Sequence, residues 1–304
     1  MKNAVKILSL IAIILVSSLL IFAVKEKKSN SYSDISTSEF YKIKALKIPK
    51  NLSFAGERVP LEKQDIKERI DRELLVNTYW QSNGLLFFKR THKYFPIIEP
   101  ILKKNGIPDD FKYLAVIESG LLNVTSPAGA RGFWQLLPNT AKENGLEVND
   151  NVDERYNLEL ATQAACNYLK EAREKFGTWT LAAAAYNAGI NGISKKMETQ
   201  QVKSYYDLLV GDETKRYVPR IVAVKEILTH PKKYGFIFEK SDLYKLKPTK
   251  QIKVDTVITD IARFSKNLGI NYKTLKLYNP WLRENKLNNK TRKEYSIKIP
   301  IEKP

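Results

Sequence analysis

The sequence predicts a mainly α-helical protein that ends in a small unit of two strands and two helices. Apolar residues recur at three- and four-residue spacing in most segments between positions 61 and 228, which is the helical period. After position 249 this spacing gives way to a strand, two short helices and a final strand. The chain has 304 residues, of which 43% are hydrophobic, so it can form about two domains with buried cores.

The N-terminal segment has the pattern of an export signal. Lys2 and Lys6 precede a nearly uncharged run at residues 7–24, and the sequence K-E-K-K follows it. This pattern predicts that residues 1–24 form either a cleaved signal peptide or a retained signal-anchor, and that the chain after them lies outside the cytoplasm. Residues 25–50 are polar and rich in Ser and Lys, so we expect a linker there.

The chain is strongly basic, with 51 Lys and Arg against 33 Asp and Glu and a formal net charge of +18. Such a charge favours a polyanionic partner, for example nucleic acid, an anionic membrane or a bacterial wall polymer with free carboxylates; a generally basic, solvated surface is the alternative. Because the lysines are spread over every segment and an export signal is present, we expect no nucleic-acid partner. The single cysteine, Cys166, has no motif around it, and no metal or other cofactor is expected.

A helical extension is expected over residues 51–100, ahead of the main domain. One helix is expected after position 61, because the apolar residues there lie along one face of a helix and the charged residues lie on the opposite face. These residues are Ile66, Ile70, Leu74 and Leu75. Two further helices are expected at residues 85–94 and 96–104, the second beginning at Pro96.

The next helix holds the first candidate for chemistry. Pro108 suits its first position, two aspartates follow in its first turn, and Gly120 ends it. Glu118 shares a face with Phe111 and Leu114, so its carboxyl should lie at the negative end of the helix on a buried side. Both circumstances raise the pKa of a carboxyl, and a carboxylic acid that is neutral near pH 7 can act as a general acid. The alternative is a glutamate that turns out to water.

A loop rich in Gly and Pro follows, over residues 125–141. Its small residues allow close backbone approach, and Phe133 and Trp134 can form an aromatic wall with the amide of Gln135 alongside, as in carbohydrate-binding clefts. An ordinary loop with a core tryptophan is the alternative. Asp153, shortly after this loop, can cap the next helix or pair with a neighbouring arginine.

Three helices complete the main domain. They are expected at residues 158–176, 179–188 and 213–228, with a loop between the last two. Pro219 predicts a break or an early turn near Tyr217 in the third.

Four motifs occur in a fixed order and spacing: E-S-G at 118–120, G-A-R-G-F-W-Q at 129–135, A-Y-N-A-G at 185–189 and E-T-K-R-Y-V-P at 213–219. This set resembles the family 1 soluble lytic transglycosylases (SLT domain), and is most similar to their membrane-bound type D branch. The resemblance covers residues 101–230. It implies a lysozyme-like helical catalytic domain of the goose type, which we expect over residues 101–236.

The resemblance also implies roles for particular residues. It makes Glu118 the sole catalytic acid/base and Tyr217 the hydrogen-bond partner of its carboxylate. The other implied positions are Ser119 beside the reacting sugar, Gln135 along the cleft, Tyr186 and Asn187 at the muramyl N-acetyl group, and Glu213 at the groove edge. From the residues alone, a second carboxylate stays open, with Asp153, Glu154 and Glu213 as candidates.

The implied reaction is cleavage of the MurNAc–GlcNAc β-1,4 bond of peptidoglycan with formation of 1,6-anhydroMurNAc ends, in cell-wall remodelling. The expected partner is the peptidoglycan glycan strand, in the periplasm or cell envelope, with membrane association if residues 7–24 are retained. No metal site is implied, and the oligomeric state is left open. Two alternatives remain: a lysozyme-like muramidase, in which water attacks, and a catalytically idle peptidoglycan-binding protein.

A separate C-terminal unit is expected over residues 249–304, after a linker at 237–248. Strands at 252–256 and 295–299 should enclose two helices, at 258–268 and 272–278. This βααβ pattern resembles a LysM module, which binds glycans that contain N-acetylglucosamine. Its usual Gly-Asp-Thr-Leu start is degraded here, since Val254 precedes Asp255, so a module kept only for docking is the alternative.

Overall fold

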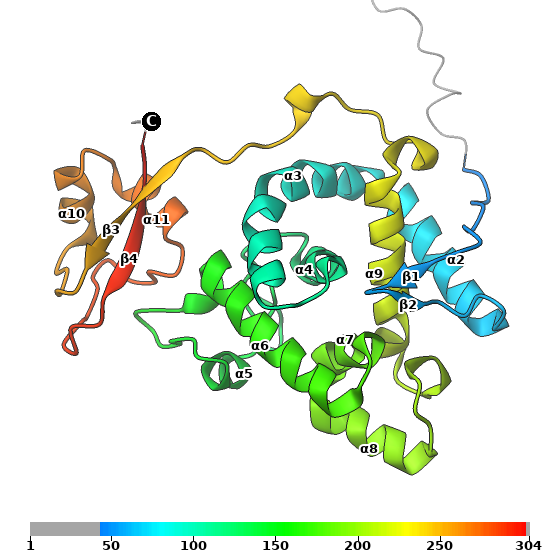
Figure 1. Cartoon of the computed structure of the whole chain (residues 1–304). Helices are drawn as coiled ribbons and strands as arrows, with labels where there is room; N and C mark the ends of the chain where they lie inside the picture. The colour runs from blue at the N-terminus through cyan, green and yellow to red at the C-terminus, as the bar shows by residue number, and fades with distance from the viewer. Residues whose placement is uncertain (1–42, 302–304) are drawn as a thin grey trace, which may run out of the picture. The chain divides into compact units, whose positions relative to one another are not determined.

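A short helix, α4 (Lys112–Ser119), lies at the centre of the main domain. The computed structural model describes residues 43–301, and Figure 1 shows α4 between the longer helices α3 (Gln81–Lys104) and α9 (Asp212–Thr229), both of which it contacts. The helix is apolar, with Leu114 and Ala115 fully buried. Its C-terminal end is therefore held from two sides by packed helices, and it is at this end that Glu118 lies.

The other elements of the main domain are helical apart from one small hairpin. They are β1 (Ser53–Phe54), β2 (Glu57–Arg58), α2 (Gln64–Tyr79), α5 (Pro138–Glu143), α6 (Leu158–Phe176), α7 (Trp179–Ala188) and α8 (Ile190–Gln200), with 3₁₀ turns at Asp109–Phe111, Glu154–Tyr156, Tyr205–Asp207, Pro231–Tyr234 and Lys240–Asp242. One continuous hydrophobic core runs through them, from Leu52 to Phe236. The mainly α class is confirmed.

The N-terminal extension is part of this core. Ile66, Ile70 and Leu74 on α2 are fully buried, as the apolar stripe predicted, and α2 packs against α9. The hairpin was not predicted; its turn needs positive φ at Ala55 and Gly56, and the Ala55 N–H is held by the Asp110 carboxylate at 2.7 Å.

The prediction that a new helix begins at Pro96 is wrong. The helices expected at 85–94 and 96–104 are one helix, α3, which passes through Pro96 and Pro100 and bends visibly in Figure 1. It also crosses the boundary expected between positions 100 and 101.

The break expected near Tyr217 is absent as well, because α9 continues through Pro219. A proline leaves the carbonyl four residues earlier without its helical partner, and here the Tyr205 hydroxyl donates to that carbonyl, of Lys215, at 2.9 Å. The expected loop before α9 contains a further helix, α8, which sequence reasoning missed.

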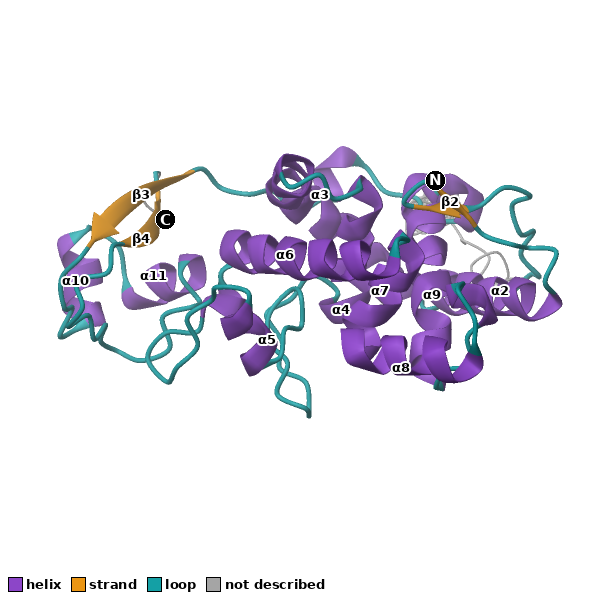
Figure 2. Cartoon of the chain, turned by 60° about the horizontal axis from the view of Figure 1, so that its bottom comes forward, coloured by secondary structure: helices purple, strands orange, loops and turns teal. Residues whose placement is uncertain are grey.

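The C-terminal unit has the expected βααβ order. Strands β3 (Thr249–Val254) and β4 (Tyr295–Pro300) pair antiparallel, with Thr249 opposite Pro300 and Val254 opposite Tyr295. Figure 2 shows this ribbon beside α10 (Ile261–Asn267) and α11 (Tyr272–Tyr278). Its own core includes Ile261, Leu275 and Ile297, all fully buried. The LysM-like fold is confirmed.

The predicted export signal lies outside the residues that the structure describes, as do residues 25–42 of the expected linker. Between positions 43 and 301, no helix is both long enough and apolar enough to span a membrane.

Candidate active site

Glu118 occupies the last turn of α4. Gly120 then takes the left-handed conformation (φ 60°) that ends the helix, as the sequence predicted. The Tyr217 hydroxyl, from α9, donates a hydrogen bond to Glu118 Oε1. Since Tyr217 is 2% exposed and packed within α9, this contact fixes the direction in which the carboxyl points.

The environment raises the pKa of Glu118 to about 7. Burial is the main cause, since it disfavours the charged carboxylate, and the negative charge of Glu213 acts in the same direction. The hydrogen bond from Tyr217 and the positive charge of Arg220 act against the rise. The raised pKa expected from the sequence is therefore present, and Glu118 can both give and accept a proton near neutral pH.

Ser119 and Tyr186, two predicted substrate-binding residues, hold the backbone of the following loop. The Ser119 hydroxyl donates to the carbonyl of Phe133 at 2.8 Å, and the Tyr186 hydroxyl donates to the carbonyl of Trp134 at 2.7 Å. Burial raises the pKa of Tyr186, and the negative charge of Glu118 adds to this rise. The hydroxyl groups of Ser119 and Tyr186 thus fix the backbone carbonyls of two consecutive loop residues, 133 and 134, beside Glu118.

The prediction of an aromatic wall is wrong. Trp134 is fully buried and Phe133 is 4% exposed, and the indole N–H donates to the Thr162 hydroxyl at 2.9 Å inside the core. A tryptophan with its one polar group satisfied in the interior offers no face to a sugar. The alternative of a loop with a core tryptophan is the correct one.

Gln135 and Asn187, the two predicted amides, are already engaged within the protein. Gln135 adopts a positive φ of 47°, and its Nε2 donates to the carbonyls of Gly132 at 2.8 Å and Val124 at 3.1 Å. Asn187 Oδ1 accepts a hydrogen bond from the Thr214 hydroxyl at 2.8 Å. Gln135 can still accept a hydrogen bond from a ligand through its amide oxygen, and Asn187 can donate one through its amide N–H groups.

Glu213 lies at the surface on the first turn of α9, with both carboxylate oxygens bonded to Arg220 at 3.0 and 3.4 Å. Arg220 also contacts Glu73 at 3.3 Å, and Glu73 in turn accepts from Arg72 at 2.5 Å and Arg216 at 2.8 Å. Glu73 is only 1% exposed. Sequence reasoning had assigned it to the charged outer face of α2 and so missed this network.

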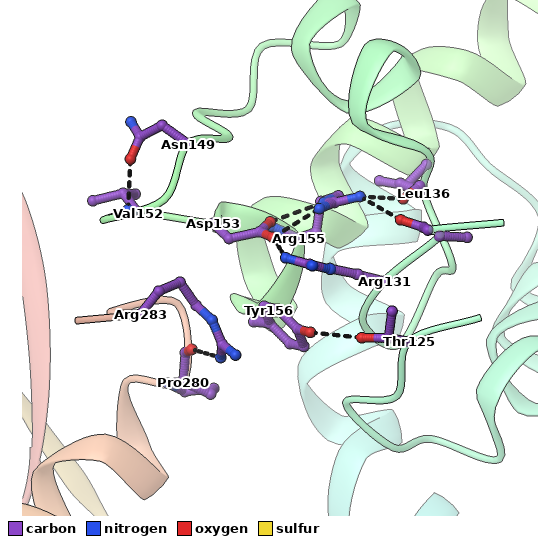
Figure 3. Close-up of polar contacts among 12 residues, drawn as sticks. Thr125, Arg131, Leu136, Asn149, Val152, Asp153, Arg155, Tyr156, Pro280 and Arg283 are labelled. Carbon is purple, nitrogen blue, oxygen red and sulfur yellow. Dashed lines mark hydrogen bonds and ion pairs between the residues drawn. The ribbon is translucent and has the colours of Figure 1, made fainter. Parts of the chain in front are cut away.

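The two other candidates for a second carboxylate are paired with basic residues elsewhere. Asp153 is fully buried and bonded to Arg155 at 2.8 Å and to Arg131 at 3.0 Å (Figure 3). Glu154 is buried and bonded to Lys293 at 2.9 Å. Asp153 pairs with Arg155, as one of its two predictions allowed. The other prediction, that it caps the next helix, is wrong, because Asn157 caps α6 and Asp153 caps only the preceding 3₁₀ turn. Of the three candidates, only Glu213 influences Glu118.

Between positions 43 and 301, no group of three or more His, Cys, Asp and Glu side chains could hold an ion. Cys166 is buried, which raises its thiol pKa to about 12 and leaves it protonated and unreactive.

The fold and the site define a class: a lysozyme-like helical domain with one protonatable carboxyl at its centre, followed by a LysM-like domain. Residues 95–209 match the transglycosylase SLT domain, and residues 250–303 match the soluble lytic transglycosylase C-terminal LysM-like domain. The chain therefore contains an SLT domain followed by a LysM-like C-terminal domain of the soluble lytic transglycosylase type.

Two curated proteins are similar to part of this chain. Membrane-bound lytic murein transglycosylase D of Escherichia coli K12 is 28% identical over 236 residues, which cover 75% of this chain and 51% of that protein. A putative tributyltin chloride resistance protein of Alteromonas is 30% identical over 102 residues, covering 33% of this chain and 49% of that one. The chain thus spans about half the length of the curated relatives it matches.

Two solved structures are similar to part of this chain at lower identity. The 70-kDa soluble lytic transglycosylase of Escherichia coli is 21% identical, with a TM-score of 0.39, covering 47% of this chain and 25% of that one. An inactive variant of lytic transglycosylase Slt from Pseudomonas aeruginosa is 21% identical, with a TM-score of 0.37, covering 50% of this chain and 26% of that one.

Proposed function

We propose that this protein cleaves the MurNAc–GlcNAc β-1,4 bond of peptidoglycan as a lytic transglycosylase, leaves 1,6-anhydroMurNAc ends, and acts in cell-wall remodelling. The observation that carries the proposal is the Glu118 carboxyl, whose pKa of about 7 and hydrogen bond from Tyr217 suit one group to successive acid and base roles. The two matched domain families support the substrate class.

The mechanism requires Glu118 to act twice. Protonated Glu118 donates to the glycosidic oxygen as an oxocarbenium-like centre forms, and the 2-acetamido carbonyl of the substrate stabilises that centre in place of a second carboxylate. Ionised Glu118 then accepts the proton of the MurNAc C6 hydroxyl, and the oxygen closes the anhydro ring. Tyr217 stabilises the ionised form between the steps, because its hydroxyl donates to the carboxylate.

The remaining predicted residues bind the glycan in this proposal. Ser119 and Tyr186 present the carbonyls of residues 133 and 134 beside the acid, and Asn187 has amide N–H groups to offer to an N-acetyl carbonyl. Gln135 lines the cleft through its free amide oxygen. Glu213, bonded to Arg220, lies at the edge of the groove.

One observation favours the muramidase alternative. Glu213 is close enough to Glu118 to raise its pKa, so it could activate a water as a second carboxylate. Against this role, both oxygens of Glu213 are held by Arg220. The single-carboxylate mechanism is therefore the better supported of the two.

The test is a digest of purified sacculi with the parent protein and with Glu118→Gln, read by mass spectrometry. We expect anhydro-ended fragments from the parent and none from the variant. Reducing ends one water heavier would establish the muramidase instead. An inactive parent that still binds sacculi would establish the idle binding protein, and a fully active Glu118→Gln would show that another residue is the acid.

The setting in the cell is part of the proposal. We place the protein outside the cytoplasm, in the periplasm or cell envelope, with residues 7–24 as signal or anchor and peptidoglycan strands as partner. The relative from Escherichia coli is named as membrane-bound, which supports a location in the cell envelope.

We also propose a division into domains. Residues 101–236 with the extension 51–100 form the catalytic part, and residues 249–304 form the LysM-like part.

A further inference from the structure

The LysM-like domain is docked on one loop of the catalytic part, residues 147–156. Backbone groups join the two: the Asp153 N–H donates to the Trp281 carbonyl, and the Arg283 N–H donates to the Asn151 carbonyl, both at 2.9 Å. Val152 lies opposite Leu282 in the same bridge. The described residues from Leu46 onward accordingly form one compact unit.

Side chains make the docking specific. Asn151 is 8% exposed; its Nδ2 donates to the Lys286 carbonyl at 2.8 Å, and its Oδ1 accepts from the Asn288 N–H at 2.8 Å. Lys293 pairs with Glu147 at 2.8 Å. Val152 and Tyr156 complete the hydrophobic core of the LysM-like domain, and the Arg283 guanidinium lies 4.3 Å from the Tyr156 ring centre.

The docked loop is bonded in turn to the loop that runs past Glu118, here named the active-site loop (residues 123–136). Figure 3 shows the Asp153 carboxylate bonded to Arg155 and Arg131. Arg155 Nη1 also donates to the carbonyls of Gly129 at 2.9 Å and Leu136 at 3.1 Å. Burial opposes the ionisation of Asp153, but the hydrogen bonds and charge of Arg155 and the hydrogen bond of Arg131 hold its pKa below the ordinary value. The Asp153 carboxyl is therefore held ionised within this cluster.

The opposite side of the active-site loop is fixed by the catalytic site itself. Ser119 and Tyr186 hold its carbonyls at positions 133 and 134. The loop is thus held at one side by residues beside Glu118 and at the other by a cluster whose central residue, Asp153, is hydrogen-bonded to the LysM-like domain.

We propose that the LysM-like domain braces the active-site loop, and that Asp153 and Arg155 are positioning residues that carry this support to Glu118. The proposal rests on the proposed function, since it gives the brace its purpose. The proposal also gives the degenerate LysM-like domain a structural role. Its segment 281–288 contacts Asn151, Val152 and Asp153 of the catalytic part of the same chain.

The test uses the full chain with Asn151→Ala, which removes side-chain hydrogen bonds across the interface and leaves the Glu118 site untouched. The matched control is Asn271→Ala, which removes the cap of α11 inside the LysM-like domain, where Asn271 Oδ1 accepts from the Thr274 N–H. Hydrogen–deuterium exchange of residues 123–136 is measured first, followed by kcat and KM on sacculi.

With Asn151→Ala we expect faster amide exchange in the active-site loop and a kcat lower by about ten-fold with little change in KM, because a small displacement of positioned groups slows the reacting step more than it weakens binding. The control should change neither. A loop that exchanges as in the parent, or a control with the same effect, would overturn the proposal.

A second variant keeps the test decisive if Asn151→Ala does not fold. Arg131→Ala cuts the bond between the loop and Asp153 from the exposed side of the cluster, since Arg131 is 39% exposed. It should loosen the same loop, and Arg131→Lys should partly restore it. Amide exchange can be measured whether or not the protein is active. If the parent is inactive but the variant's active-site loop exchanges faster than the parent's, the proposed function is refuted and the support of the loop by the LysM-like domain is retained.

Discussion

Tyr217 and Glu118, which lie 99 positions apart in the chain, meet through one hydrogen bond donated by the phenol to the carboxylate. The two residues come from α9 and α4, which pack against each other. Burial makes the carboxyl a weaker acid and the tyrosine makes it a stronger one, and the balance leaves its pKa at about 7. This balance is what a group needs if it must be an acid in one step and a base in the next.

Replacing the tyrosine should change the pH profile in a defined direction. In the parent, kcat/KM should fall as pH rises through about 7, because Glu118 must start protonated. Tyr217→Phe removes a bond that lowers this pKa, so the alkaline limb should move to higher pH, while the best rate drops about ten-fold as the ionised form loses its partner. The pH–rate profile on sacculi measures both effects.

The control for that profile is Tyr186→Phe. The Tyr186 hydroxyl donates to the Trp134 carbonyl and makes no bond to Glu118, so its loss removes no hydrogen bond that lowers the Glu118 pKa. The alkaline limb should move less than with Tyr217→Phe. An alkaline limb that stays in place or moves to lower pH in Tyr217→Phe would contradict the assignment of Tyr217.

The raised pKa of Glu118 should also cost stability at high pH. The folded protein keeps the proton up to about pH 7, whereas the unfolded chain releases it near the ordinary glutamate pKa of 4.5, so the free energy of unfolding should fall as pH rises between these values. Glu118→Gln cannot ionise, and its amide oxygen can still accept from Tyr217. We expect it to be more stable than the parent by about 1–3 kcal/mol at pH 8, and by much less at pH 4.

Urea denaturation of both proteins at several pH values measures this difference. The many other titrating groups cancel in the comparison, since the two chains differ at one position. Stability curves that run parallel from pH 4 to pH 8 would show that Glu118 has an ordinary pKa, and the two-step role proposed for it would fail.

The sequence predicted elements best where the capping residues are local. The ends of α6 and α7 were placed correctly, and the structure shows a polar cap at the start of each helix (Asn157 and Thr178) and a glycine at its end (Gly177 and Gly189). These signals act within a few residues of the helix end, so they can be read without the rest of the fold.

Features that depend on residues far away in the sequence could not be predicted from local signals. Pro219 is tolerated inside α9 because the Tyr205 hydroxyl satisfies the carbonyl of Lys215, and no local pattern shows that contact. Trp134 was placed in the cleft because its neighbours are small, but Thr162 holds it in the core. Similarly, the raised pKa of Glu118 followed from its helix, whereas its pairing with Tyr217 came only from the family resemblance.

Glu73 provides a test of a buried charge that the sequence placed on the outside. Glu73→Ala leaves Arg216 and Arg220 without their common partner at the junction of α2 and α9, and these arginines are only 26% and 18% exposed. Removing one member of a buried ionic network is strongly destabilising, so the free energy of unfolding should fall by about 3 kcal/mol.

The control is Glu62→Ala, which breaks an ion pair with Arg58 in which both side chains are more than half exposed. Exposed pairs contribute little, so this variant should unfold almost as the parent does. Urea denaturation compares the three proteins. If Glu73→Ala and Glu62→Ala lower the free energy of unfolding by the same amount, the Glu73 network is as solvated as the surface pair.

The close approach between the active-site loop and the docked loop can be tested at Gly132. This residue has a φ of 79°, and a Cβ there would lie 2.0 Å from the Arg155 carbonyl oxygen. Gly129 in the same loop has nearly the same φ, 81°, with nothing within 4 Å of the added atom. The left-handed conformation costs each alanine variant about 1–2 kcal/mol. Gly132→Ala must also push two backbones apart, which adds about 1–3 kcal/mol.

We therefore expect Gly132→Ala to be clearly less stable than Gly129→Ala in urea denaturation, and to lose more activity at temperatures where both are folded. The activity difference follows because Phe133 and Trp134, whose carbonyls are fixed beside Glu118, come directly after Gly132. If the two variants lose the same stability and the same activity, the contact with Arg155 does not set the position of the loop, and the left-handed turn alone explains both glycines.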